Sequence, residues 1–427
     1  MKTLQERDLE HLWHPYTQHQ TAHPPIAIVK AKDALLWDEN GEEYIDAIAS
    51  WWVNPYGHAN EALARAAYQQ LTQLEHVLFG GFTHEPAIRL AEKLISILPS
   101  NQQKIFFSDN GSTAIEVAIK MAIQYFYNQN EKRHVIIAFE EAFHGDTFAA
   151  MAASGISFFT EAFKNQLLEV VRIPVPFEGK EEVSCQALEN AIAKYNPAAF
   201  IFEPLVQGAA GMKMHAPEAL DKLIDSCRKA NVLTIADEVM TGFGKTGKPF
   251  ACNYLTEKPD IVCLSKALTG GTVPLAVTSS TQMIYDAFLS EDVNKALFHG
   301  HTFMANPTGC AIALEAIRLL ESDVMQQNIS RIKNKHLDFI KKIENNPKTE
   351  NPRLLGVILA FEIKSSKKTD YYGEIRNQLY DFFISKGVLL RPVGNTVYVL
   401  PPYIITNRQL QTIYDALEEA IERFGIA

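Results

Sequence analysis

Between about residues 69 and 268, helical sequence patterns alternate with short apolar runs. This alternation is typical of stacked βα units, which bury a mostly parallel sheet between layers of helices. Polar, glycine or proline residues follow each run, as expected where a buried strand leaves the sheet. The candidate strands are residues 104–107, 134–139, 198–202, 232–236 and 261–264. We therefore predict an α/β fold with a large, mostly parallel sheet flanked by helices.

The pattern changes after about residue 305, where a long helical stretch precedes several short apolar runs. These runs, near residues 357–363, 388–390 and 397–400, predict a smaller α+β domain. Strand-like segments at residues 34–37 and 44–46 are expected to pack with this domain or to cover the site. The predicted units are an N-terminal segment (1–50), a large domain (51–305) and a small domain (306–427).

The composition disfavours several classes of partner. A formal net charge of −10 gives no broad attraction for nucleic acid or for an anionic membrane surface. The five cysteines are odd in number and widely spaced, so neither a disulfide framework nor a metal site is expected. The N-terminus carries charges where a signal peptide needs apolar residues, and no apolar run is long enough to cross a bilayer. We expect a soluble, cytoplasmic protein.

Polar residues follow the candidate strands at the edge where an open α/β sheet binds ligands. One such segment, Asn-Gly-Ser-Thr at residues 110–113, lies between a strand and a helical pattern. Its backbone N–H groups would open a helix and could hold a phosphate, with Gly111 allowing close approach. The alternative is an ordinary helix cap, in which Ser112 or Thr113 only starts the helix.

Two titratable residues stand at the ends of candidate strands. Asp237 follows the run 232–236, where a carboxylate could keep a pyridine nitrogen protonated. Lys266 follows the run 261–264, where burial would supply the neutral amine that a Schiff base needs. Singly, each has an ordinary interpretation, as a salt-bridged acid and a surface lysine. Their separation, 266 minus 237 or 29 residues, is about one βαβ step and would point both into one crevice. Together with a phosphate-binding helix start, they fit pyridoxal 5'-phosphate.

Arg391 places a charge beside the apolar run 388–390 and directly before Pro392. A buried charge needs a partner, which could be a protein carboxylate or the carboxylate of a ligand. Both interpretations stay open from the residues alone. Trp51 and Trp52, if extended, would point to opposite faces, so that one is core and the other a pocket wall.

The segments around Asp237 and Lys266 resemble the class III, fold type I aminotransferases, which use pyridoxal 5'-phosphate. They read Ala-Asp-Glu-Val at residues 236–239 and Leu-Ser-Lys-Ala at residues 264–267. The resemblance covers nearly the whole chain. Further segments resemble the group in that family that forms 7,8-diaminononanoate in biotin synthesis. They are His-Pro-Tyr-Thr (14–17), Ser-Trp-Trp (50–52), Phe-His-Gly-Asp-Thr (143–147), Lys-Ala-Leu-Thr-Gly-Gly-Thr (266–272) and Arg-Pro (391–392).

The resemblance implies roles around the cofactor. Lys266 would form the Schiff base and act as the catalytic residue, and Asp237 would contact the pyridine nitrogen. The other implied cofactor-binding residues are Gly111 and Ser112 at the phosphate, Phe143 stacked on the ring, and His301 and Thr302. Because Thr302 would reach the cofactor of a neighbouring subunit, the resemblance implies a homodimer with shared active sites.

The resemblance also implies small-molecule substrates. An amino donor would load the cofactor, and 8-amino-7-oxononanoate would then receive the amine. Tyr16, Trp52, Phe143 and Gly300 would line the substrate pocket, and Arg391 would bind the acceptor carboxylate. The expected donor is S-adenosylmethionine, with lysine as the alternative.

Three residues depart from the pattern of that group. Phe143 stands where a tyrosine is usual, Lys245 where an arginine is common, and His301 where many relatives have proline. Phe143 keeps an aromatic face but loses a hydroxyl, and Lys245 replaces a planar fork with a flexible ammonium. These changes leave the cofactor chemistry intact and bear on the choice of donor. Met240 favours this group, because many other family members carry glutamine there.

Other readings of the sequence are weaker. Residues 242–249 nearly match a nucleotide-binding P-loop, but Pro249 occupies the Ser/Thr position and offers no hydroxyl for Mg²⁺. A non-enzymatic pyridoxal phosphate-binding protein is disfavoured by the presence of both Lys266 and Asp237. Another class III omega-aminotransferase could use the same anchors, because they bind the cofactor and leave the reaction to the pocket.

Overall fold

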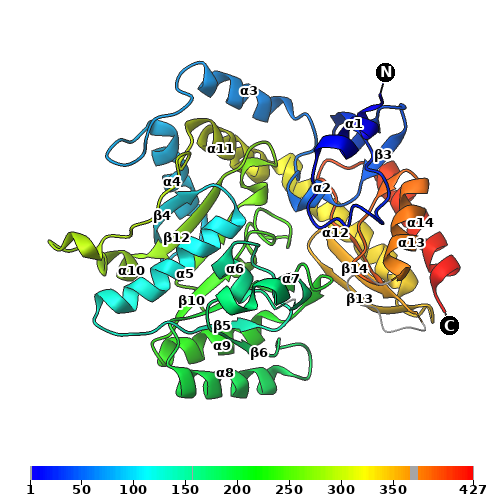
Figure 1. Ribbon diagram of the computed structural model, residues 1–427. Helices are drawn as coiled ribbons and strands as arrows, with labels where there is room; N and C mark the ends of the chain where they lie inside the picture. Colours follow the sequence, from blue (N-terminus) through cyan, green and yellow to red (C-terminus); the bar gives the residue numbers. More distant parts are fainter. Residues whose placement is uncertain (1, 156, 366–373, 427) are drawn as a thin grey trace.

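A seven-stranded sheet lies at the centre of the molecule (Figure 1). The structure is a computed structural model that describes residues 2–155, 157–365 and 374–426. In the order β4-β12-β11-β10-β7-β5-β6, the strands of this sheet are β4 (Gln102–Ser108), β12 (Ala276–Thr281), β11 (Ile261–Leu264), β10 (Leu233–Asp237), β7 (Ala199–Phe202), β5 (Ile136–Phe139) and β6 (Val170–Ile173). Strands β11 to β6 pair in parallel, whereas β12 pairs antiparallel with both β11 and β4. The predicted α/β fold with a mostly parallel sheet is confirmed.

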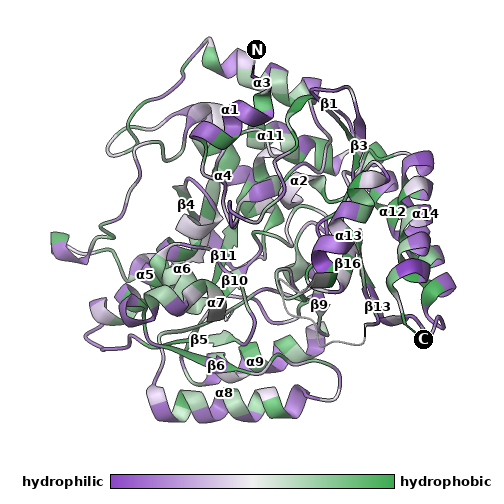
Figure 2. Ribbon diagram, turned by 45° about the vertical axis from the view of Figure 1, so that its right-hand side comes forward, coloured by the Kyte–Doolittle hydropathy of each residue, from purple (hydrophilic) through white to green (hydrophobic). Residues whose placement is uncertain are grey.

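Helices cover both faces of this sheet. Successive residues of a strand point to opposite sides, and because both sets are apolar here, both faces are buried. In β7, Ala199 and Ile201 pack into a core with α5 and α6, whereas Phe200 and Phe202 pack into a core with α8 and α9. These helices are α5 (Gly111–Asn128), α6 (Phe148–Ala153), α8 (Glu181–Tyr195) and α9 (Pro217–Lys229). Hydrophilic and hydrophobic residues alternate along the outer helix α8 (Figure 2), as expected of a helix with one buried face.

The two ends of the chain share a second, smaller unit. A four-stranded sheet joins β1 (Ile28–Lys32), β2 (Leu35–Asp38) and β3 (Glu43–Asp46) to β15 (Val388–Leu389), with Ile45 of β3 opposite Val388. Figure 1 shows these N-terminal strands in blue beside the orange and red C-terminal elements. A three-stranded sheet follows, of β13 (Thr349–Leu355), β14 (Ile358–Ile363) and β16 (Thr396–Val399). The domain boundaries at residues 50 and 305 stay predictions.

The long helical stretch after residue 305 is two helices, α11 (Pro307–Glu321) and α12 (Asp323–Ile343). The Ser322 side chain accepts a hydrogen bond from the Met325 amide, so it caps α12 and separates the two. The remaining helices are α1 (Leu4–His11), α2 (Ala49–Trp52), α3 (Glu61–Leu71), α4 (Glu85–Ile97), α7 (Ser157–Thr160), α10 (Gln282–Asp286), α13 (Glu374–Ser385) and α14 (Asn407–Phe424). Short 3₁₀ helices span Glu161–Gln166, Ala251–Tyr254, Lys266–Thr269 and Val293–Lys295, and β8 (Val206–Gln207) pairs with β9 (Lys213–Met214).

No helix in the described ranges is both long enough and apolar enough to span a membrane.

Candidate active site

A cavity of about 450 Å³ lies beyond the carboxyl ends of the parallel strands. It brings together residues that are distant in the sequence but were expected to meet at this edge of the sheet. Among its lining residues are Trp52, Gly111, Ser112, Phe143, Asp237 and Lys266. The structure therefore assembles in one place the predicted phosphate-binding segment, the strand-end acid and the strand-end lysine.

Lys266 begins the short helix that follows β11, and its backbone has a φ of +49°. A non-glycine residue in this left-handed region costs free energy, and such residues gather at functional sites. Its Nζ lies 4.8 Å from the centroid of the Trp52 ring. Burial lowers the pKa of Lys266, while the negative charges of Asp237 and Glu203 raise it. A lowered pKa makes an amine easier to deprotonate to the neutral form that a Schiff base needs.

Asp237, the last residue of β10, is held from two sides. One carboxylate oxygen accepts a hydrogen bond from the Val239 amide at 3.0 Å, and the other lies 2.7 Å from Nδ1 of His144. The His144 side chain is fully buried, and its Nε2 has no hydrogen-bond partner in the part of the chain that the structure describes. No role for His144 could be predicted from the sequence, because nothing local indicates its contact with a residue 93 positions away.

The first turn of α5 and the loop 143–147 form a tight cradle beside this pair. Asn110 caps α5 through its side chain, which accepts from the Thr113 amide. The Ser112 hydroxyl lies 2.8 Å from Oγ1 of Thr147 and accepts a hydrogen bond from the Thr147 amide at 3.0 Å. A Cβ at Gly145 would lie only 2.3 Å from the Ser112 Oγ, so only glycine fits there. Backbone N–H groups at such a helix start suit a phosphate.

Glu203 fixes the backbone that carries Phe143 into the cavity. Its carboxylate accepts hydrogen bonds from the amides of Phe143 at 3.1 Å and Gly208 at 2.9 Å. Burial raises the pKa of Glu203 to about 7, with His144 opposing and Asp237 adding to the rise. Glu203 was not identified from the sequence, because its partners come from other loops.

These groups fit pyridoxal 5'-phosphate. Lys266 offers an amine, Asp237 a carboxylate for a ring nitrogen, and the start of α5 a place for a phosphate. Phe143 adds an aromatic wall. Nothing in the described ranges indicates a metal instead, since no group of three or more potential His, Cys, Asp or Glu ligands occurs there.

A second cavity of about 320 Å³, here called the chamber, adjoins the first. Trp52, Val53, Phe143, Ala209 and Lys266 line both cavities. The chamber is also lined by Tyr16, Trp51, Phe159, Arg376, Arg391 and Tyr398. Of the predicted substrate residues, it therefore gathers Tyr16, Trp52, Phe143 and Arg391. Arg376 was not identified from the sequence.

Arg391 lies with its guanidinium carbon 4.8 Å from the centroid of the Trp51 ring. Among the described residues, no carboxylate forms an ion pair with Arg391, so the protein-carboxylate interpretation finds no support there. The two tryptophans are not extended: they lie in α2, where Ser50 and Trp52 have φ values of +59° and +65°. Trp52 is nonetheless buried and Trp51 exposed.

Gly300, His301 and Thr302 do not line either cavity of their own chain. Gly300 and Thr302 are exposed. Nδ1 of His301 lies 3.6 Å from the carboxylate of Asp109, a residue of the first cavity, and its Nε2 lies 3.0 Å from that of His299. This loop therefore reaches the rim of the cavity from outside.

Lys245 is fully buried and donates a hydrogen bond to the Gly242 carbonyl at 3.2 Å. A P-loop lysine must instead reach a phosphate at the start of a helix, and only the short 3₁₀ helix Ala251–Tyr254 follows here. The geometry disfavours a nucleotide-binding loop.

Comparisons with known proteins show the family of this chain. A family model described as "Aminotransferase class-III" matches residues 16–421. An adenosylmethionine-8-amino-7-oxononanoate aminotransferase from Synechococcus elongatus is 44% identical, covering 96% of this chain and 98% of its own length. A protein of the same name from Staphylococcus aureus is 37% identical, covering 98% and 97%.

Solved structures of similar fold have related names. A protein of that name from Methanocaldococcus jannaschii has a TM-score of 0.93 at 32% identity, with 99% of each chain covered. An omega transaminase from Pseudomonas jessenii in complex with PMP has a TM-score of 0.91 at 26% identity, covering 99% of this chain and 98% of its own. The chain therefore belongs to the class III aminotransferases, enzymes that depend on pyridoxal 5'-phosphate.

Proposed function

We propose that this protein transfers an amino group to 8-amino-7-oxononanoate to give 7,8-diaminononanoate, a step of biotin biosynthesis, with S-adenosylmethionine as donor. The observation that carries the proposal is the chamber: it joins Lys266 to Arg391, whose guanidinium has no carboxylate partner among the described residues. A long keto acid with a distant carboxylate suits such a space. The names of the most similar relatives support the same acceptor and donor.

In this proposal Lys266 carries the cofactor and, once released, moves the proton. Bound pyridoxal phosphate supplies an electron-accepting ring that carries the amino group between two substrates. Asp237 holds the ring nitrogen protonated, and His144 orients Asp237 through their 2.7 Å contact. Gly111 and Ser112 bind the phosphate, and Phe143 stacks on the ring.

Arg391 binds the acceptor carboxylate with its planar fork, which stacking on Trp51 orients. Trp52 and Tyr16 form the walls along which the carbon chain lies, and Gly300 completes the pocket from a second subunit. His301 and Thr302 reach the cofactor phosphate of that neighbouring subunit. The active form is thus a homodimer with shared sites, and we propose that it works in the cytoplasm.

The donor is tested in a single half-reaction. Holoenzyme is mixed with S-adenosylmethionine or with lysine in the absence of acceptor, and the cofactor absorbance is followed. S-adenosylmethionine should convert the cofactor, and addition of 8-amino-7-oxononanoate should then restore the spectrum and yield 7,8-diaminononanoate by mass spectrometry. If lysine converts the cofactor and S-adenosylmethionine does not, the donor is lysine. Failure to aminate 8-amino-7-oxononanoate after either donor would overturn the proposed acceptor.

The role of Lys266 has its own test. Borohydride reduction of the holoenzyme should fix the cofactor covalently to the peptide that contains Lys266. Cofactor found on another lysine would contradict this role.

A further inference from the structure

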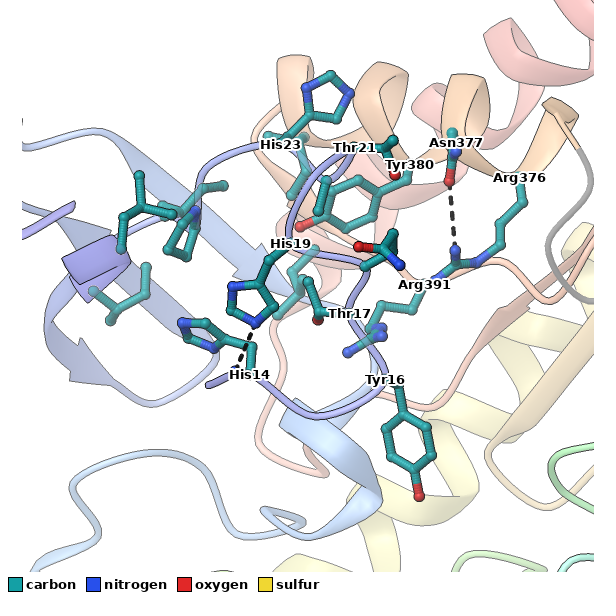
Figure 3. Close-up of a pocket in the computed structure, with 18 of the residues that line it drawn as sticks. His14, Tyr16, Thr17, His19, Thr21, His23, Arg376, Asn377, Tyr380 and Arg391 are labelled. Carbon is teal, nitrogen blue, oxygen red and sulfur yellow. Dashed lines mark hydrogen bonds between the residues drawn. The ribbon is translucent and has the colours of Figure 1, made fainter. Parts of the chain in front are cut away.

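Beyond Arg391 lies a third cavity of about 490 Å³, here called the vestibule. It is enclosed by the N-terminal segment and by α13, and Figure 3 shows it with Arg376 from α13 and Arg391 from the segment after β15. Tyr16, Arg376 and Arg391 line both the vestibule and the chamber. The two arginines therefore stand at the boundary between the two spaces.

Most residues that line the vestibule are apolar or neutral; besides two arginines and three histidines, no ionisable acid of the described ranges other than tyrosine lines it. Two of its three histidines already have acidic neighbours: His14 lies 2.6 Å from Asp8, and His23 lies 3.3 Å from Asp381. The arginines are always charged, whereas a histidine is charged only when protonated. The permanent positive charge facing this boundary thus comes from Arg376 and Arg391.

Tyr380 lines the vestibule together with Arg376 and Arg391. Burial raises the pKa of the Tyr380 phenol, and the positive charges of Arg391 and Arg376 both oppose that rise. Arg376 also donates a hydrogen bond to the Asn377 side chain at 3.4 Å, as drawn in Figure 3. The guanidinium carbon of Arg391 lies 4.8 Å from the centroid of the Trp51 ring, and Arg376 comes from α13.

We propose that Arg376 is a second carboxylate-binding residue, which holds the acceptor carboxylate together with Arg391. The inference rests on the proposed function, since the ligand is the carboxylate of a long-chain acceptor. A carboxylate has two oxygens and about four acceptor positions, so one guanidinium cannot satisfy it fully when water is excluded. Arg376 supplies the remaining donors from the side of the vestibule. It thereby favours acceptors whose chain is long enough to reach this boundary.

The test uses nonanoate, which has a nine-carbon chain and a carboxylate but no reactive carbonyl, and nonanamide, its neutral counterpart. Binding of each to the holoenzyme is measured by calorimetry for the unaltered protein and for Arg376→Gln, Arg376→Lys and Arg408→Gln. Arg408 is an exposed arginine of α14 outside the three cavities, so its variant controls for loss of one positive charge.

Arg376→Gln should weaken nonanoate binding roughly ten- to a hundredfold, the usual range for hydrogen bonds to a charged group. It should leave nonanamide binding unchanged, and Arg376→Lys should recover part of the loss. Equal weakening of both ligands would mean that Arg376 only supports the wall. That result would overturn the inference. So would nonanoate affinity that does not change in Arg376→Gln, or a failure of the unaltered holoenzyme to bind nonanoate. The proposed function fails separately, if 8-amino-7-oxononanoate is not aminated.

Discussion

Lys245 has an environment that is rare for a lysine. Its side chain is fully buried, and its ammonium donates to the Gly242 carbonyl. Burial and, second to it, the charge of Lys266 lower the pKa of Lys245 to about 7, against the opposing charge of Glu238. The folded protein therefore carries a titratable group in its core whose charge is costly near neutral pH.

The pH dependence of stability follows from the sign of this shift. Because the folded-state pKa lies below the ordinary 10.5, the unfolded chain binds more protons between about pH 7 and 10.5. Lys245 should therefore make stability rise with pH in this window, by up to about 1.4 kcal/mol per pH unit. Below about pH 7 both states hold the proton, and the cost of the buried charge is fully present.

Lys245→Met keeps the length of the side chain and removes the charge. The free energy of unfolding of the variant minus that of the unaltered protein should be larger at about pH 6 than at about pH 9. Denaturant unfolding of the cofactor-free protein at both values measures this difference. Lys248→Met, at an exposed lysine of the same loop, is the control and should show no such trend. A stability difference that does not change with pH would contradict the assignment.

At the level of residues, the sequence could predict those whose chemistry depends on their place at a strand end. Lys266 and Asp237 are of this kind, because parallel strands carry their ends to one edge. His144 and Glu203 could not be found in this way. Their importance comes from contacts with Asp237 and with the amides of Phe143 and Gly208, which depend on the packing of separate loops.

At the level of elements, the buried strand β12 was missed from the sequence because it is not an apolar run. β12 reads Ala-Val-Thr-Ser-Ser-Thr, yet every residue of it is buried. It can be buried because its hydroxyls have partners: Thr278 donates to the Ala114 carbonyl at 2.9 Å and Ser279 to the Gln102 side chain at 2.7 Å. β6 and β13 were missed too. β13 contains Pro352 and a positive φ at Asn351, which interrupt its register with β14.

The loop 143–147 offers a test of the cradle at the start of α5. In Gly145→Ala, the new Cβ would meet the Ser112 Oγ at 2.3 Å and its Cα at 3.0 Å. The clash should displace Ser112 and weaken cofactor binding at least tenfold, because a phosphate needs these groups in place. Gly179→Ala is a matched control, since Gly179 also has a positive φ but open space around it.

Titration of the apo-protein with pyridoxal phosphate measures both variants. Gly179→Ala should lose about 1 kcal/mol of stability from strain and keep its cofactor affinity. If Gly145→Ala binds the cofactor as tightly as Gly179→Ala does, Ser112 does not hold the phosphate.

At the level of the whole molecule, the chamber lies where three parts of the chain meet. Tyr16 comes from the N-terminal segment, Phe143 and Lys266 from loops beyond the large sheet, and Arg391 from beside β15. The pairing of β3 with β15 fixes the first of these parts to the last. Small changes in how the smaller unit packs should therefore alter substrate binding before they alter cofactor binding.

The loop 298–303 suggests that the site is completed by a second copy of the chain. Thr302 is exposed and lies outside the cavities of its own chain. Beside it, Phe298 and Phe303 are 67% and 62% exposed, which is unusual for large apolar side chains grouped in one loop. A partner subunit that covers these rings would bring Thr302 to a cofactor it cannot reach alone.

Mixed dimers of Lys266→Ala and Thr302→Asp test this arrangement. Each variant alone should be inactive or nearly so, because one lacks the amine and the other sets a carboxylate against the phosphate. In a mixed dimer, one site combines Lys266 of the second variant with Thr302 of the first and is intact, while the other site carries both changes. Co-expression with two different tags and tandem purification should therefore recover about half of the activity of an unaltered dimer, by this one-in-two count of intact sites. If Thr302 acted within its own chain, both sites of every mixed dimer would be damaged and no activity would return.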